Sequence, residues 1–266
     1  MNELGFDIQE ARPWFTRRQF PGHLLVTVSE QAAATWAEVL GIPVRRCYIS
    51  DGALGERSAL LGISSTEVIG AVLPDAGSTM SGDFGEILVL FYNCATELVT
   101  APVNAKKWRL KQDRTKPAPH SDVLNFILPA WPAASEEDVV ICSEVKAKAT
   151  DGDSTPVASA IADCAKDRTS RLGRTLEWLK ERAIGEDLGA LTIAHLERFI
   201  KAVEFPPATK RFQAVAVVCS NLLQVELAAA PAVPHPDYTV IVISVPELKE
   251  KYSAVFASAA ASGDEG

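Results

Sequence analysis

The sequence contains few residues of the kinds that bind zinc. It has five cysteines and four histidines in 266 residues, and no Cys-x-x-Cys pair occurs. Zinc sites in proteins combine Cys and His ligands at short spacings, so this scattered distribution excludes one. Several of the cysteines lie within apolar runs, which is typical of reduced and buried thiols. We therefore expect a protein of a reducing compartment, the cytoplasm.

Long apolar segments and internal repeats are also absent. No apolar run approaches the roughly 18 residues of a membrane span. The first residues, MNELGFDIQEARPWF, carry acidic groups and lack the apolar core of a signal peptide. No repeat occurs at the periods of solenoids or propellers. We expect no membrane association.

Positive charge is scarce and unevenly distributed. The chain has 26 Lys and Arg residues against 34 Asp and Glu residues, which gives a net charge of −8. An acidic chain binds nucleic acid poorly on its own, because nonspecific affinity comes mainly from cations that displace phosphate counterions. One segment, 104–120, is basic. It predicts DNA contacts through Lys106, Lys107, Lys111 and Lys116, with a solvated loop as the alternative.

The first 80 residues are expected to form an N-terminal α/β lobe. Ser29 is a favourable N-cap for an alanine-rich helix that continues to residue 40. Strands are expected over 46–50 and 66–73, with a glycine-containing loop between them.

The remaining chain is expected to form one α/β domain, 81–256, followed by a flexible tail, 257–266. The apolar run from residue 84 to Leu98 predicts a buried helix. Helices are also expected over 156–182, over 192–203 and from Glu247 onward. Strands are expected over 121–128, 139–147, 214–219 and 239–245. Such an order of helices and strands indicates a single sheet flanked by helices.

Glu144, Val145 and Lys146 lie in one of these strands. Residues two apart in a strand point to the same face, so the carboxylate and the ammonium group project together. Asp122 begins the preceding strand, and a hairpin would place it beside Glu144. Two carboxylates and the Val145 carbonyl form an all-oxygen site suited to Mg²⁺ or Mn²⁺. Lys146 would then hold or deprotonate a metal-bound water, and Glu86 on the buried helix would orient a ligand.

The Glu-x-Lys triplet carries little information by itself. A second triplet, Glu247-Leu248-Lys249, occurs in the chain, and chance alone would give as many. Only the triplet at 144–146 lies on an apolar strand with an acidic residue leading the strand before it. The alternative is that Glu144 and Lys146 lie on a solvated strand face with a cross-strand ion pair. The residues alone leave both interpretations open.

The order of these features resembles the PD-(D/E)XK nuclease core. More narrowly, it resembles the HamA-type nucleases of bacterial Hachiman anti-phage defence. The resemblance covers 82–182 well and the rest of the chain by element order. Serine stands at the position before Asp122 where the motif's name has proline. The matching elements are Gly85-Glu86 on an apolar helix, the lysine-rich segment, Ser121-Asp122, and Ser143-Glu144-Val145-Lys146.

This resemblance implies a restriction-endonuclease-like fold, in which helices flank a central mixed sheet. It implies that Asp122 and Glu144 bind the metal, that Lys146 is the catalytic lysine and that Glu86 is the helix carboxylate. The implied function is degradation of DNA in the bacterial cytoplasm, held in check until a superfamily 2 helicase partner meets phage or damaged DNA. The N-terminal lobe is our candidate for binding that partner.

Two other functions fit the same residues. The chain is either a catalyst or a noncatalytic adaptor that keeps a nuclease fold in order to dock on a helicase and regulate it. A nuclease that processes RNA with the same metal chemistry is the third possibility. His120 is adjacent to Asp122 but has no partner, so we expect a loop histidine. His195 lies on a helix with Leu196 and Phe199, so we expect it to be structural.

Overall fold

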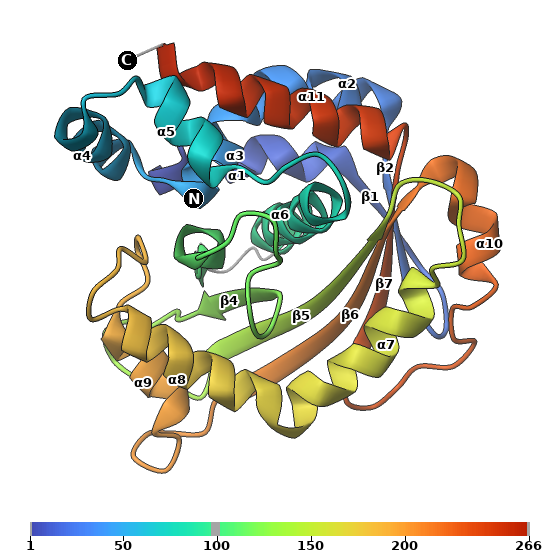
Figure 1. Cartoon of the computed structure of the whole chain (residues 1–266). Coiled ribbons are helices and arrows are strands. Elements are labelled where there is room, and N and C mark those ends of the chain that lie inside the picture. The colour runs from blue at the N-terminus through green and yellow to red at the C-terminus, as the bar shows by residue number, and fades with distance from the viewer. Residues whose placement is uncertain (1, 97–101, 265–266) are drawn as a thin grey trace.

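The computed structural model describes residues 2–96 and 102–264 and contains a seven-stranded mixed sheet (Figure 1). The order of the strands across the sheet is β1-β2-β7-β6-β5-β4-β3. Their bounds are β1 Phe15–Gln19, β2 Leu24–Val28, β3 Val103–Asn104, β4 Val123–Ile127, β5 Val139–Lys148, β6 Thr209–Cys219 and β7 Thr239–Val245. The expected α/β class with a central mixed sheet is confirmed.

The strand directions divide the sheet into a parallel centre and antiparallel edges. Strands β5, β6, β7 and β2 run parallel to one another, while β4 pairs antiparallel with β5, β3 with β4, and β1 with β2. Parallel neighbours need long crossover connections. The crossover from β5 to β6 contains α7, α8 and α9, which span Pro156–Lys166, Leu172–Arg182 and Ile193–Ile200.

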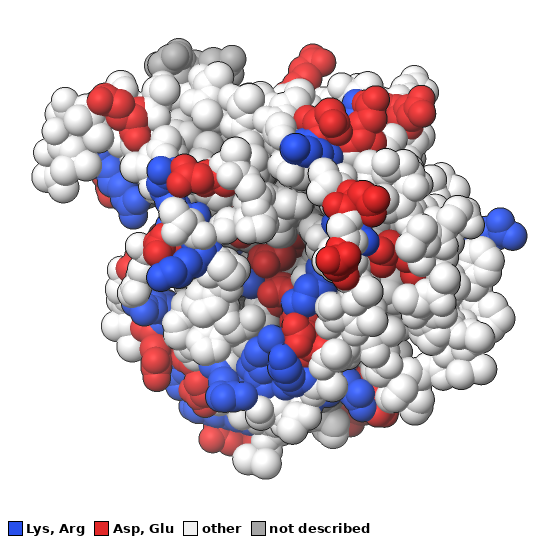
Figure 2. Space-filling view, turned by 45° about the vertical axis from the view of Figure 1, so that its right-hand side comes forward, with Lys and Arg blue, Asp and Glu red and all other residues white. Residues whose placement is uncertain are grey.

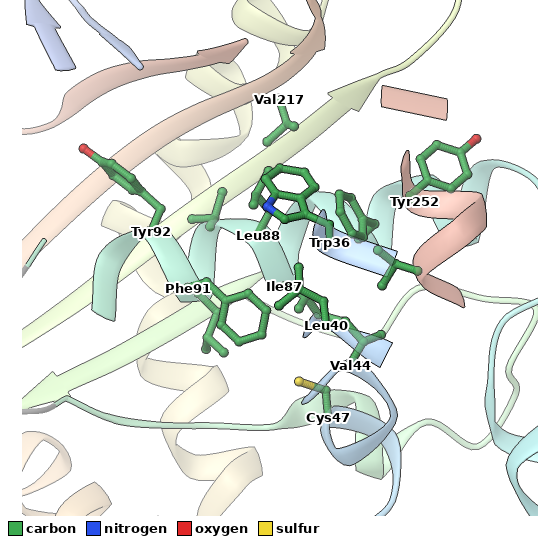
Figure 3. Close-up of a cluster of buried hydrophobic side chains, with 14 of the residues drawn as sticks. Trp36, Leu40, Val44, Cys47, Ile87, Leu88, Phe91, Tyr92, Val217 and Tyr252 are labelled. Carbon is green, nitrogen blue, oxygen red and sulfur yellow. The ribbon is translucent and has the colours of Figure 1, made fainter. Parts of the chain in front are cut away.

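One face of the sheet is covered by α6, Ser78–Thr96, and a layer of helices outside it (Figure 1). Helix α6 is buried over most of its length because helices lie on one side of it and the sheet on the other. Figure 3 shows part of this core, where Trp36 and Leu40 meet Ile87, Leu88 and Val217. The surrounding helices are α1 Ile8–Ala11, α2 Glu30–Val39, α3 Gly41–Tyr48 and α11 Leu248–Ala261.

Helices α7 to α10 cover the opposite face. Val157 and Ala160 of α7 pack against Ala214 and Ala216 of β6, and α10, Leu223–Leu227, extends this layer. A π-helical turn, Asp167–Arg171, joins α7 directly to α8. The expected continuous helix over 156–182 is therefore confirmed with one local widening of the helix. Within the described residues, no helix has both the length and the apolarity needed to cross a membrane.

The expected strands over 46–50 and 66–73 are wrong, because both segments are largely helical. The chain forms α3, then α4, Asp51–Leu61, and α5, Ser65–Val72. Ser50 and Ser64 accept hydrogen bonds from backbone N–H groups of the first turns of α4 and α5. Such caps satisfy N–H groups that a helix otherwise leaves unpaired. The expected helix behind Ser29 is confirmed as α2.

The first 80 residues do not fold as a separate lobe. Strand β2 pairs with β7 through Leu24↔Ile241 and Val26↔Ile243, so the N-terminal hairpin extends the central sheet. Trp36 of α2 is fully buried in the same core as α6. The boundary expected at residue 80 is therefore not a boundary between two cores, and 1–80 cannot be removed without exposing the sheet.

The expected bounds of the C-terminal tail and of helix α6 also change. The expected tail over 257–266 is wrong for 257–261, which form the last turns of α11 because Ala259 is buried against the core. Residues 262–264 continue as a 3₁₀ turn. Helix α6 begins at Ser78, earlier than expected, and its expected continuation to Leu98 falls outside the described residues.

Candidate active site

The expected hairpin of Asp122 and Glu144 is confirmed by the pairing of β4 with β5. The last pair of the ladder is Val123↔Ser143, and β5 continues beyond it without a β4 partner. At this fork, Asp122 Oδ2 accepts a hydrogen bond from the Val145 amide at 2.8 Å. The side-chain carboxylate thus satisfies an amide that β4 no longer reaches. This places Asp122 beside the triplet Glu144-Val145-Lys146.

The fork also presents a backbone oxygen. The N–H and C=O groups of one residue in an extended strand point toward the same neighbouring strand. Because the Val145 amide points to Asp122, its carbonyl lies on the same open edge of β5. The Val145 side chain points to the α6 face, where it packs against Gly85. Glu144 and Lys146 project to the opposite face, toward α7 and α8.

Glu144 is almost completely buried and has cationic partners on both carboxylate oxygens. Oε1 lies 2.5 Å from Lys146 Nζ, and Oε2 pairs with the Arg171 guanidinium. Burial raises the pKa of Glu144 to about 8, and the charge of Asp122 acts in the same direction, while Lys146 and Arg171 oppose both. Loss of hydration is thus the main penalty on the charged form of Glu144, and additional positive charge beside it would offset that penalty.

Lys146 connects this carboxylate to solvent. Its side chain is 31% exposed, and its ammonium group lies 3.0 Å from Asp163 Oδ2 of α7 as well as close to Glu144. Burial lowers the pKa of Lys146, but the hydrogen bond and charge of Glu144, together with Asp122 and Asp163, outweigh this effect and raise it. Lys146 is consequently a charged hydrogen-bond donor in this state. Of the two roles expected for it, holding a ligand fits better than removing a proton.

Glu86 approaches the fork from the other face of the sheet. Its Oε2 accepts a hydrogen bond from Trp108 Nε1 at 3.1 Å and lies 3.4 Å from Lys107 Nζ. Burial raises the pKa of Glu86 well above the usual value, Lys107 lowers it, and Asp122 raises it further. The charge of Asp122 thus raises the pKa of both Glu86, on the α6 side, and Glu144, on the α7 side.

Lys107 joins these carboxylates inside the protein. Its ammonium group lies 3.6 Å from Asp122 Oδ1 and donates a hydrogen bond to the Ser121 carbonyl at 2.9 Å. The side chain is only 4% exposed. Lys107 therefore neutralises the acidic residues of the site and does not project from the surface as a phosphate contact would.

The other lysines expected to contact DNA are mostly internal too. Lys106 is buried and pairs with Glu3, and Lys111 pairs with Asp83 at 2.8 Å with its side chain 3% exposed. Lys116 is the exposed member of the set, with a 3.2 Å ion pair to Asp113. The positive charge of this segment largely serves ion pairs within the chain, so the expected surface contacts through Lys106, Lys107 and Lys111 do not fit their burial.

A second set of residues, on α7 and the π-helical turn, completes the surroundings of Glu144. Asp167 accepts hydrogen bonds from Arg171 Nε at 2.7 Å and from Ser121 Oγ at 2.6 Å. The network thereby ties the start of β4 to Glu144 on β5. Sequence reasoning missed Asp163, Asp167 and Arg171. Their spacing of four residues, which puts charged groups on one helix face, was the available signal.

The two histidines lie as expected. His120 is a loop residue with a positive φ of 70°, and its ring packs against Trp178 with centroids 5.0 Å apart. His195 has a structural role, because its Nδ1 accepts a hydrogen bond from the Thr192 amide at 3.0 Å and so completes the N-terminal cap of α9.

Comparison with known protein families gives one decisive result. The family model for HamA matches residues 14–259, which is nearly the whole chain. The chain belongs to the HamA family. It is therefore a protein of Hachiman anti-phage defence. A search of curated proteins finds no match.

The HamA match includes the N-terminal hairpin and α11 as well as the Glu144 region. Because β2 and α11 are part of the same core as α6, the extent of the match agrees with a single folding unit. The matched region thus includes β1 and β3, the two edge strands of the sheet, and extends beyond the segment 82–182 on which the resemblance was based.

One face of this HamA-family chain, shown in Figure 2, is hollowed. In Figure 2, acidic side chains lie at the bottom of a hollow in the centre of the molecule, and Lys and Arg side chains gather around it. The acidic side chains would repel the negative charge of a phosphate group that approaches this hollow. A divalent metal ion bound between them would offset this repulsion.

The donors at the fork are suited to such a metal, but they are few. The carboxylates of Asp122 and Glu144 and the Val145 carbonyl are hard oxygen ligands of the kind that Mg²⁺ and Mn²⁺ prefer. Among the described residues, no group of three His, Cys, Asp or Glu side chains converges on one point. The remaining ligands of an octahedral ion would have to be backbone, water and substrate oxygens, as is usual for Mg²⁺.

Proposed function

We propose that this HamA-family protein is a metal-dependent nuclease that hydrolyses phosphodiester bonds in DNA. The observation that carries the proposal is the hydrogen bond from the Val145 amide to Asp122. It fixes a carboxylate next to the Glu-x-Lys triplet at the open edge of β5. The second triplet, at Glu247, begins a helix and has no such neighbour on a preceding strand.

In this proposal Asp122, Glu144 and the Val145 carbonyl hold Mg²⁺ or Mn²⁺. When bound, the ion supplies Lewis-acid stabilisation of the charge that develops on the phosphate. Glu86 acts as a positioning residue, because it holds Lys107 against Asp122 and the Ser121 carbonyl. Its indole partner, Trp108, fixes the carboxylate on the α6 side.

Lys146 is the proposed catalytic lysine. Its side chain is partly exposed, and Glu144 and Asp163 engage two of its three N–H donors, so one donor remains for a ligand. An ammonium group there donates to a water or to a phosphate oxygen and stabilises added negative charge. This role agrees with the raised pKa, because the lysine must keep its proton.

A partner that delivers DNA is part of the proposal. The chain has a net charge of −8, and Lys106, Lys107 and Lys111 are engaged in ion pairs inside the protein. These three lysines therefore add little to counterion release, and the net negative charge opposes it, so solitary binding should be weak. A superfamily 2 helicase is the partner that we propose, and co-purification with the product of a neighbouring helicase gene tests it.

The test of catalysis uses the chain with its co-expressed helicase. Linear DNA and a structured RNA of the same length are incubated with Mg²⁺ or with EDTA. We expect cleavage of DNA that needs Mg²⁺ and is abolished by Glu144→Ala. If the wild-type complex leaves DNA intact, the nuclease proposal fails. Preferential cleavage of RNA would instead indicate an RNA-processing enzyme.

One observation favours a noncatalytic adaptor as the alternative. Both oxygens of Glu144 are already paired with cations, and its side chain is 1% exposed, as in a purely structural ion-pair network. An adaptor predicts that Glu144→Ala and Lys146→Ala leave both helicase binding and protection against phage unchanged. The nuclease proposal predicts that protection is lost while helicase binding remains.

A further inference from the structure

A cavity of about 190 Å³ is lined in part by the basic segment. Its wall is formed by α4, by the segment 108–114 and by the last turn of α8, which are far apart in sequence. Positive side chains dominate this wall, and Glu186 is the acidic residue in it. The cations are Arg57, Arg109, Lys111, Arg114 and Arg182.

Three of these cations are fixed by contacts within the protein. Arg109 donates two hydrogen bonds to the Arg46 carbonyl, at 2.8 and 3.1 Å. Arg114 pairs with Asp75 and donates to the Leu73 carbonyl at 3.3 Å. Lys111 is held by Asp83. These contacts make the inner wall rigid and leave its charge largely compensated.

Arg57 and Arg182 differ from the other three. Within the part of the chain that the structure describes, neither guanidinium has a hydrogen bond or an ion pair. Arg57 lies on α4, which buries only Leu54 and packs on α5, and Arg182 is the last residue of α8. Two uncompensated guanidinium groups thus line one cavity from different elements. An anion bound in the cavity would interact favourably with both groups.

We infer that this cavity binds a terminal phosphate, that is, a phosphate monoester. A monoester carries between about one and a half and two negative charges at neutral pH, which matches two free guanidinium groups. Arginine forms paired, planar hydrogen bonds with phosphate oxygens. A volume of 190 Å³ holds roughly six water molecules, which is room for a phosphate and part of its sugar. A phosphodiester within a strand would need a groove that is open at both ends.

The cavity shares a wall with the candidate active site. Trp108 lines the cavity and donates its indole hydrogen bond to Glu86 at 3.1 Å. Lys111 lines it as well and pairs with Asp83, which precedes Glu86 on α6 by one turn. A free nucleotide and the end of a DNA strand both carry the required group. The second source rests on the proposed nuclease function, because that function supplies DNA ends as substrate or product.

The test measures binding of the whole chain in EDTA, so that it does not depend on cleavage. Fluorescent oligonucleotides of one sequence are compared with a 5′-phosphate, with a 3′-phosphate or with hydroxyl groups at both ends. Deoxyadenosine monophosphate is the competitor. The variants are Arg57→Ala, Arg182→Ala and the double variant. Arg17→Ala, an exposed arginine on β1, is the matched control, and thermal melting verifies that each variant is folded.

We expect a terminal phosphate to tighten oligonucleotide binding about tenfold, which corresponds to one well-placed charged hydrogen-bonding group. The double variant should lose this preference, and Arg17→Ala should keep it. Displacement by deoxyadenosine monophosphate assigns the cavity to free nucleotides as well, and a lack of displacement assigns it to strand ends. A second outcome is that the protein binds deoxyadenosine monophosphate and that only the double variant loses this binding. That result supports the inference even when the oligonucleotides show no preference. Equal binding of all oligonucleotides without nucleotide binding, or a preference that the double variant retains, overturns it.

Discussion

The carboxylate of Asp122 accepts the hydrogen bond of the Val145 amide at 2.8 Å, two residues beyond the last residue of β5 that pairs with β4. This single contact has two functions in our account. It satisfies a backbone donor that β4 no longer reaches, and it holds a carboxylate beside Glu144. The structural and the chemical function can be separated by substitution.

Asp122→Asn should keep the fold and lose activity, whereas Asp122→Ala should lose both stability and activity. Asparagine retains an oxygen that accepts the amide hydrogen bond, but it has no charge for a metal. Alanine leaves the Val145 amide unpaired, which costs about 1–3 kcal/mol in the free energy of unfolding. Denaturant unfolding and a cleavage assay measure the two effects. An active Asn variant, or an Ala variant as stable as the wild type, would contradict this account.

Arg171→Met should destabilise the protein through Glu144. The substitution removes the partner of Glu144 Oε2 and of the Asp167 carboxylate, and both carboxylates are buried. The free energy of unfolding should fall by about 2–4 kcal/mol, since Lys146 still compensates Glu144. Arg174→Met, which removes an exposed arginine bonded to Ser170, is the control and should change stability little. Equal stability of both variants would show that the Arg171 network does not hold the site together.

Asp163 should make a pH-dependent contribution to stability. Its hydrogen bonds to Lys166 and Lys146 lower its pKa from 3.8 to about 2, although burial acts in the opposite direction. A lowered pKa means that the contribution is complete above pH 4 and is lost as the pH falls toward 2. After allowance for solvent screening, Asp163→Asn should cost about 1–2 kcal/mol at pH 6. Unfolding curves of both proteins should therefore converge on acidification, and a difference that grows below pH 4 would refute the assignment.

The five cysteines should be unreactive in the folded protein. All are free and buried, and burial raises the pKa of Cys47, Cys94 and Cys164 to about 12. The thiolate is the reactive form, so it is suppressed at neutral pH. Titration with a thiol reagent at pH 7 should detect almost no thiol until denaturant is added, and then five. Rapid reaction in the native state would show that the core opens.

The sequence pattern predicted the elements whose hydrophobic periodicity is strong. Strands β4 to β7 and the long helix over 156–182 were found because their apolar residues recur at the spacing of a strand or a helix. The hairpin of Asp122 and Glu144 followed from the same pattern. Helix α4 was missed because it buries only Leu54, so that its sequence has no apolar face to detect.

The remaining parts of the site depend on contacts that no local pattern encodes. The basic segment looked like a surface that binds phosphate, but Lys107 and Lys111 each face a carboxylate of α6 that lies more than 20 residues away in sequence. Arg171 reaches Glu144 only because the π-helical turn places it above β5. Ion pairs between distant elements are set by the packing of those elements, and composition alone does not reveal them.

The central claim is that the triplet at the fork of β4 and β5 is catalytic, and a comparison of two lysines tests it most directly. Lys146 and Lys249 each end a Glu-x-Lys triplet, but only Lys146 lies beside Asp122. The measurement is the rate constant for Mg²⁺-dependent DNA cleavage by the complex with its helicase. We predict that Lys146→Ala lowers it at least about a hundredfold, within the range of positioned catalytic groups, and that Lys249→Ala leaves it unchanged. Equal rates for the two variants would contradict the account.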